Sequence, residues 1–255
     1  MRSDLNKSYY ESLYEDSVDP ASFEVRSKLL SLKHALRSVR IANGAPRVLD
    51  VGFGGGEILN AASKAYPKAR CAGVENAQTA IQTVGRAHPD WDLRVACAGE
   101  LPFESKSFDV VICSHTLEHL ADDLPAAQEI RRVVKPQGYV VIGVPGPASG
   151  DNPLHERLYT PEMLQKLFGG LQTRYMRCYG SHRFLTIYWK IRKAAQSAKM
   201  IETGEIQSSR GTGSILSKIG MAAGIPILLA LYEIDSRLFQ DVKNPFEVWA
   251  VWQNS

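Results

Sequence analysis

Cysteine is scarce in this sequence, and its spacing excludes two kinds of cross-link. The 255-residue chain has four cysteines, Cys71, Cys97, Cys113 and Cys178, far apart and without a paired metal-ligand spacing. The sequence therefore supports neither a disulfide framework nor a cysteine zinc site, and we expect no metal. Buried thiols in a reducing compartment are the expectation.

An excess of one charge and an N-terminal apolar segment are also missing. Thirty Lys and Arg residues against 27 Asp and Glu give a formal net charge of +3. This balance does not indicate a protein dedicated to coating nucleic acid. The opening stretch MRSDLNKSYYESLYEDS has no apolar region typical of an export signal, so we expect a cytoplasmic protein. Hydrophobic residues make up 44% of the chain, enough for one large domain or a domain with an insertion.

Short apolar runs alternate with amphipathic ones after a first helix expected over residues 22–41. The pattern predicts strands near 47–52, 70–74, 93–97, 108–114 and 138–144, and helices near 57–66, 77–87 and 123–135. Such alternation indicates a mostly parallel sheet covered by helices on both faces. Ligands of such sheets bind beyond the carboxyl ends of the strands, so the residues there are the candidate site.

A glycine-rich loop, DVGFGGGE, follows the first predicted strand. Glycine lets the backbone turn sharply and approach a ligand, and a helix start offers unpaired N–H groups. The dinucleotide spacing G-x-G-x-x-G, begun at Gly52, would put Glu57 at its third glycine, where a carboxylate would repel a pyrophosphate. The spacing is instead D-x-G-x-G-x-G, formed by Asp50, Gly52, Gly54 and Gly56.

This loop resembles that of the class I S-adenosylmethionine-dependent methyltransferases, whose ligand carries a sulfonium and no phosphate. The stretches ELPFESKSFDVVICSHTLEHL, 100–120, and EIRRVVKPQGYVVIGVP, 129–145, resemble the family's later segments in the same order. The resemblance covers residues 47–145. It implies an α/β fold with a Rossmann-like seven-stranded sheet, S-adenosylmethionine as methyl donor and S-adenosylhomocysteine as product.

The resemblance also implies which residues bind the cofactor. Glu75 would bind the ribose hydroxyls, while Cys97 stands where the family often has an acidic residue for the adenine amino group, so neighbouring backbone and apolar groups would hold the adenine instead. Tyrosines of SYYESLY would close over the cofactor, although ordinary packing explains them equally well. The expected cofactor-binding residues are Asp50, Gly52, Gly54, Gly56, Glu75, Asn76, Ala98, Gly99, Leu101, Ser114, Tyr10 and Tyr14.

Two histidines are candidate catalytic bases, His115 after the fourth strand and His155 in the loop after the fifth. A hydroxyl acceptor needs a group that takes its proton near neutral pH, and histidine suits that task. Surface or hydrogen-bonded histidines are the alternative for both. We expect His119, in the family's LEHL pattern, to cap or pack the site. A carbon acceptor or a neutral amine would need no strong base.

The stretch before the last strand departs from a minimal fold of this type. The resemblance implies a closing antiparallel hairpin at 171–179 and 246–252, which leaves a long insert. Residues 171–218 contain nine basic and two acidic residues, and residues 214–239 are dense in apolar residues but too interrupted for a membrane span. We expect one domain with an N-terminal helical cap at 1–46, a core at 47–180 and 245–255, and a helical lid insert at 181–244.

These features together predict methyl transfer to a small, lipophilic metabolite, most readily at oxygen, with a cationic rim suited to an anionic group. Three alternatives stay open. A basic, aromatic insert would fit an RNA-modifying or nucleic-acid-binding enzyme, although no RNA-binding module is recognisable and we expect no nucleic-acid partner. A lipid or isoprenoid methyltransferase would dock on an anionic membrane surface. A non-catalytic cofactor-binding protein would explain Cys97. The oligomeric state does not follow from the sequence.

Overall fold

A computed structural model describes residues 22–42, 44–150, 152–179, 226, 229–234, 237, 243 and 245–255. Predictions for Tyr10, Tyr14 and most of the insert at 181–244 lie outside these residues.

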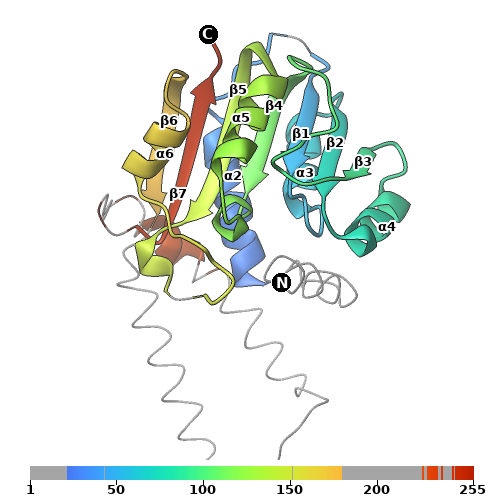
Figure 1. The fold of residues 1–255 in the computed structure, drawn as a ribbon. Coiled ribbons are helices and arrows are strands. Elements are labelled where there is room, and N and C mark those ends of the chain that lie inside the picture. Colours follow the sequence, from blue (N-terminus) through green and yellow to red (C-terminus); the bar gives the residue numbers. More distant parts are fainter. Residues whose placement is uncertain are drawn as a thin grey trace, which may run out of the picture.

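A seven-stranded sheet with the order β3-β2-β1-β4-β5-β7-β6 forms the centre of the molecule (Figure 1). The strands are β1 (Arg47–Val51), β2 (Arg70–Glu75), β3 (Asp92–Val95), β4 (Phe108–Ser114), β5 (Val134–Pro145), β6 (Gln172–Tyr179) and β7 (Glu247–Gln253). Strands β1 to β5 pair in parallel, and β7 is antiparallel to both β5 and β6. The predicted seven-stranded α/β fold is confirmed.

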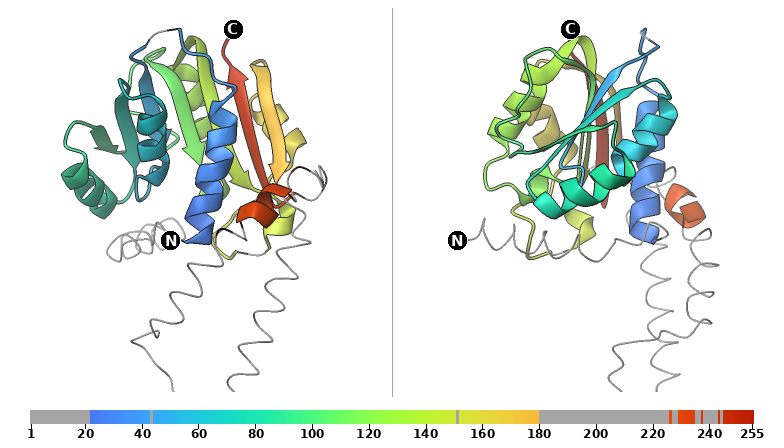
Figure 2. Two further views of the ribbon diagram at one scale, coloured as in Figure 1. Left: turned by 180° about the vertical axis from the view of Figure 1, so that it is seen from behind. Right: turned by 90° about the vertical axis from the view of Figure 1, so that its right-hand side faces the viewer.

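Helices cover both faces of this sheet, and Figure 2 shows α5 and α2 on opposite sides of it. The helices are α2 (Phe23–Leu36), α3 (Glu57–Ala65), α4 (Gln78–Ala87), α5 (Leu124–Val133) and α6 (Pro161–Leu167), with short 3₁₀ turns η1 (Leu117–His119) and η2 (Pro147–Ser149). The Ser22 side chain accepts a hydrogen bond from the Val25 amide at the start of α2, and Thr160 does the same for Met163 at the start of α6. Both caps satisfy helix-start N–H groups.

The core has one layer on each face because neighbouring strand residues point to opposite sides of a sheet. Leu49 and Ile142 pack with Ile130 of α5, in the layer that also holds α6. Their neighbours Val48 and Val141 belong to the layer with α2 and α3. Strands buried on both sides explain why the sequence shows continuous apolar runs there.

Several predicted boundaries are wrong by a few residues, and the first helix, expected over residues 22–41, spans only Phe23–Leu36. The helix expected to reach residue 135 ends at Val133, and β5 begins at Val134 with a register shift against β4. Pro136 lacks the N–H that a helix interior needs, and Gln137 has a φ of 62°. The strand expected to reach residue 97 ends at Val95, which leaves Cys97 exposed in the following turn.

The strand order reverses between the adjacent strands β1 and β4. From β1 the chain continues to β2 and β3 on one side of the sheet, and from β4 it continues to β5 on the other side. In open α/β sheets such a reversal opens a crevice beyond the carboxyl ends of the strands. The ends of β1, β2, β4 and β5 share this edge, and β7, which runs the other way, begins at it. Residues from both ends of the sequence therefore meet there.

Candidate functional site

The glycine loop follows β1 and has a backbone that few other residues could adopt. Gly52, Gly54 and Gly56 have φ values of 77°, 54° and 84°. A Cβ atom on Gly52 would lie 2.2 Å from Thr116 Oγ1, and one on Gly56 would lie 2.9 Å from Val84 Cγ1. The loop therefore needs glycine for its backbone conformation and for its close packing.

Glu75, at the end of β2, is hydrogen-bonded to this loop. Its Oε2 accepts from the Gly54 amide at 3.1 Å, and its Oε1 accepts from the Asn76 amide at 2.8 Å. The Gly52 amide donates to the Val74 carbonyl at 2.8 Å. The structure thus brings together the glycine loop and Glu75, which the sequence analysis predicted to bind the same cofactor.

Three carboxyl groups gather around the loop. Asp50 is 1% exposed, and burial, followed by the charges of Glu75 and Glu57, raises its pKa to about 8. A site with such groups disfavours a phosphate and favours a ligand with a positive charge. The loop is therefore suited to a cationic rather than an anionic ligand.

The candidate adenine-binding residues lie in the turn after β3. Ala98 and Leu101 are buried in the α5-side core, and Gly99 is exposed. The Leu101 amide donates to Glu129 Oε2 at 2.7 Å, which ties the turn to α5. Ser114, at the end of β4, is buried, and its hydroxyl has no hydrogen-bond partner among the described residues.

His115 follows β4 directly and lies between two buried carboxylates. Its Nε2 is 2.7 Å from Glu247 Oε1, and its Nδ1 is 3.4 Å from Glu118 Oε1. Burial and the charge of Lys28 lower the pKa of His115, but the two carboxylates outweigh them and raise it. The ring is held in place by groups from η1 and β7.

Glu247 is a site residue that the sequence analysis missed. It is the first residue of β7 and pairs in register with Pro145, the last residue of β5. Its carboxylate also accepts hydrogen bonds from Ser31 Oγ, at 3.2 Å, and from the Tyr232 hydroxyl. The one signal in the sequence is a lone acidic residue in the otherwise apolar strand FEVWAVW.

The other two histidines predicted near the site lie beside Glu118. The ring centroids of His119 and His155 are 5.0 Å apart, and His119 Nδ1 donates to the Leu154 carbonyl at 3.1 Å. Burial lowers the pKa of His155, against the opposing charge of Glu118. The structure therefore gathers His115, His119 and His155 at one edge of the sheet.

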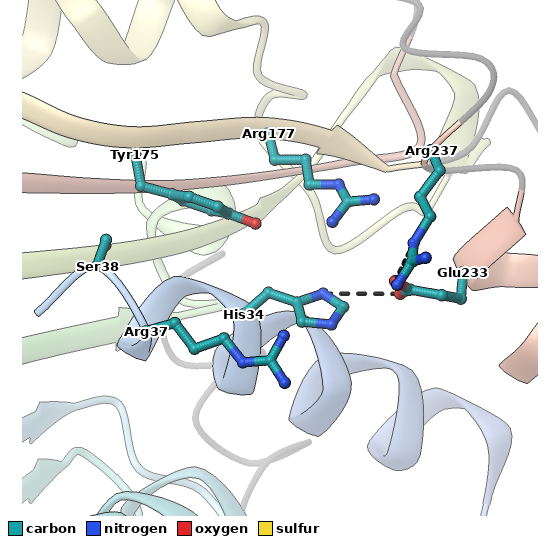
Figure 3. A pocket seen from close by; sticks show the side chains of 7 residues that line it. All are labelled: His34, Arg37, Ser38, Tyr175, Arg177, Glu233 and Arg237. Carbon is teal, nitrogen blue, oxygen red and sulfur yellow. Dashed lines mark hydrogen bonds and ion pairs between the residues drawn. The ribbon is translucent and has the colours of Figure 1, made fainter.

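A cavity of about 310 Å³ lies on the α2 side of the sheet, between α2, β6 and the segment around Glu233 (Figure 3). Its lining includes Arg37, Arg177 and Arg237. Glu233 forms an ion pair with Arg237, at 2.8 Å, and its Oε2 lies 3.6 Å from His34 Nδ1. We call it the arginine cavity. Three guanidinium groups around one carboxylate make it suited to an anion.

A second cavity, of about 540 Å³, lies at the opposite edge of the sheet from the glycine loop, lined by residues that precede β1 and follow α3. It contains none of the candidate site residues. No helix within the described ranges is long and apolar enough to cross a membrane.

Comparison with known proteins gives matches to methyltransferases. Residues 49–142 match the methyltransferase domain family. The malonyl-[acyl-carrier protein] O-methyltransferase of Halorhodospira halophila is 34% identical over 146 residues, which cover 55% of this chain and 46% of that protein. The ubiquinone biosynthesis O-methyltransferase of Paracidovorax citrulli is 37% identical over 101 residues, which cover 37% of this chain and 41% of that protein. The matches thus span less than half the length of these curated relatives.

Structural similarity extends over nearly the whole chain. One chain of the complex between the Haloferax volcanii Trm112 methyltransferase activator and its partner methyltransferase aligns with a TM-score of 0.63 and 17% identity. The alignment covers 96% of this chain and 97% of that one. At this level of identity, the similarity establishes the fold.

Proposed function

Residues 49–142 form a class I S-adenosylmethionine-dependent methyltransferase domain, and from this premise we propose that the protein methylates a small, lipophilic acceptor, most readily at oxygen. When bound, S-adenosylmethionine supplies an activated methyl group, which an acceptor nucleophile attacks in line with the departing sulfur. The carbon–sulfur bond breaks as the new bond to methyl forms, and the acceptor oxygen loses its proton. Holding the two reactants in line is the main task of the protein.

The observation that carries this proposal is the glycine loop with Glu75 bonded to it. Gly52, Gly54 and Gly56 would let the cofactor's sulfur and amino-acid portion approach the backbone, and Asp50 would orient the loop. Glu75 would exchange its bond to the Gly54 amide for the ribose hydroxyls. The negative loop suits a sulfonium. We assign Asn76, Ala98, Gly99, Leu101 and Ser114 to the remaining cofactor contacts, with the adenine beside Ala98 and Leu101.

His115 is the better placed of the two candidate bases. Glu247 holds its Nε2 at 2.7 Å, as a carboxylate orients a catalytic histidine, while the contact of Nδ1 with Glu118 is longer, at 3.4 Å. An acceptor hydroxyl that displaced this longer contact would meet Nδ1 and could transfer its proton there. His155 is the second candidate, since its Nδ1 has no hydrogen-bond partner in the part of the chain that is described.

The acceptor class is inferred from two further features. Tyr232, one of the described residues of the insert, is buried and bonds Glu247 next to His115, so the insert contributes to this part of the site. None of the candidate site residues lines the arginine cavity, so the anionic group on the acceptor stays a prediction from the basic insert. The two curated relatives described above are O-methyltransferases, and other relatives at 30–31% identity are ubiquinone/menaquinone biosynthesis C-methyltransferases. The quinone-biosynthesis relatives support a lipophilic acceptor, and oxygen and carbon acceptors are both represented among the relatives.

Calorimetric titration of the full chain with S-adenosylmethionine and S-adenosylhomocysteine tests the cofactor. Glu75→Ala and Glu75→Gln should each bind at least tenfold more weakly, because alanine has no acceptor and glutamine replaces one of the two acceptor oxygens by an NH₂ donor. This loss corresponds to about 1.4 kcal/mol. Glu104→Ala, which removes an exposed carboxylate from a loop, is the matched control and should bind like the wild type.

Transfer itself is measured with methyl-labelled S-adenosylmethionine and a mixed small-molecule extract. We expect label in the organic phase after partition, as a lipophilic product requires. Absence of cofactor binding by the folded wild type would contradict the whole proposal. Label that stayed with nucleic acid would contradict the acceptor class.

A further inference from the structure

Glu118, His119 and His155 form a cluster that the cofactor assignment does not use. One ligand atom from each lies within 4.8 Å of the others. Glu118 and His119 come from η1, and His155 comes from the loop between η2 and α6. A carboxylate and two imidazoles that converge from two segments are a donor set typical of divalent metal sites.

The Glu118 carboxylate is buried at the centre of this cluster. It is 1% exposed, and neither oxygen has a hydrogen-bond partner among the described residues. Among the described side chains, His115 Nδ1 lies 3.4 Å and His119 Nε2 lies 3.9 Å from Glu118 Oε1. Buried polar atoms are normally satisfied by a partner, and a cation bound at this cluster would contact these two oxygens directly.

The two histidines are prepared as ligands in different ways. The Leu154 carbonyl accepts from His119 Nδ1 at 3.1 Å, which leaves the lone pair on Nε2, the nitrogen closer to Glu118. Metal-bound histidines typically donate their second nitrogen to a carbonyl or carboxylate in this manner. His155 has a buried Nδ1 without a hydrogen-bond partner, while its Nε2 lies 3.1 Å from Asn152 Nδ2. Binding through Nδ1 would move the ring proton to Nε2 and turn the Asn152 amide.

We propose that Glu118, His119 and His155 bind a divalent transition-metal ion at the acceptor edge of the sheet. Bonds of about 2.0–2.2 Å would bring the three ligand atoms about 3–3.5 Å apart, so the loop that carries His155 must move inward. Two imidazoles and one carboxylate favour Zn²⁺, Co²⁺ or Mn²⁺ over Mg²⁺, which prefers oxygen ligands.

The position of this ion suggests a role in the methyl-transfer reaction, and this part of the inference rests on the proposed function. Glu118 contacts His115, the candidate base, so the ion would lie beside the acceptor. With three protein ligands it would keep open positions, and an acceptor oxygen bound there would lose its proton more readily. The substrate class would then be acceptors that offer an oxygen ligand, such as a hydroxyl beside a carbonyl or a second hydroxyl.

The test is direct metal binding by the full-length protein after treatment with a chelator. Titration with Co²⁺, followed by its visible absorption, and calorimetry with Zn²⁺ and Mn²⁺ should show one ion per chain. Glu118→Gln, His119→Ala and His155→Ala should each weaken binding at least tenfold. His88→Ala, which removes a histidine stacked on Trp91 at 3.7 Å and remote from the cluster, should bind like the wild type.

Two controls keep the result interpretable. Thermal unfolding checks that each variant is folded, and the partly exposed loop position of His155 makes its variant the least disruptive. S-adenosylmethionine binding is measured on the same samples without metal, so failure of the cofactor assignment is seen separately. A wild type that binds the cofactor but no metal, or ligand variants that bind metal as well as His88→Ala does, would overturn the metal site.

Discussion

The backbone of the glycine loop leads to a sharp prediction about Gly52→Ala. Gly52 has a φ of 77°, and a non-glycine residue there carries about 1–2 kcal/mol of strain. Its Cβ would also lie 2.2 Å from Thr116 Oγ1, which donates to the Val51 carbonyl at 3.1 Å. Displacing Thr116 loses a hydrogen bond that contributes about 0.5–1.5 kcal/mol. We therefore expect the free energy of unfolding to fall by about 2–3 kcal/mol.

Gly55→Ala is the matched control in the same loop. Gly55 is not among the residues with positive φ, and its Cβ would meet the flexible end of the Glu57 side chain, at 2.6 Å, which can move. Chemical denaturation and thermal melts of both variants make the comparison. For a chain of this size, Gly52→Ala should lower Tm by about 4–12 °C. Equal losses in the two variants would show that loop conformation and the Thr116 contact do not determine stability here.

Two other perturbations follow from buried polar groups. Between about pH 4 and pH 8, Asp50 is protonated in the folded state and ionised in the unfolded state. The free energy of unfolding therefore falls as pH rises through this range. The stability of Asp50→Asn relative to the wild type should therefore increase from about pH 5 to about pH 8. A difference in Tm between the two proteins that stays constant over this range would contradict the prediction. Tyr232→Phe removes hydrogen bonds to Ser31 and to the buried Glu247 and should cost about 1–3 kcal/mol in denaturant titrations. Tyr175→Phe, at a less buried hydroxyl, should cost less.

Local patterns in the sequence were enough to predict most of the fold. The strands β1 to β5 appear as short apolar runs because parallel strands are buried on both faces, and the intervening helices show their own periodicity. The glycine loop could be located because its positive φ values and close contacts require glycine, and Glu75 because it ends the next strand. These features depend on residues within about one βαβ unit of each other.

The pairing of His115 with Glu247 could not be predicted in this way. The two residues are 132 positions apart, and they meet because β7 inserts antiparallel beside β5 and begins at the edge where β4 ends. His115 could be identified as a candidate base from its place after a strand, but its carboxylate partners depend on tertiary packing. The same holds for Tyr232, whose contacts with Ser31 and Glu247 join three distant segments.

The distribution of charge at this edge connects the two proposals. The whole chain carries a formal net charge of +3, yet Asp50, Glu57 and Glu75 surround the glycine loop, and Glu118 and Glu247 share His115. Asp50 keeps its proton below about pH 8, so the charged carboxylates are Glu57 and Glu75 at the loop and Glu118 and Glu247 beside His115. A sulfonium at the loop and a divalent ion at Glu118 would each neutralise one of the two groups. The carboxylates at these two places would thus select positively charged ligands, and the separate binding measurements can test each place independently.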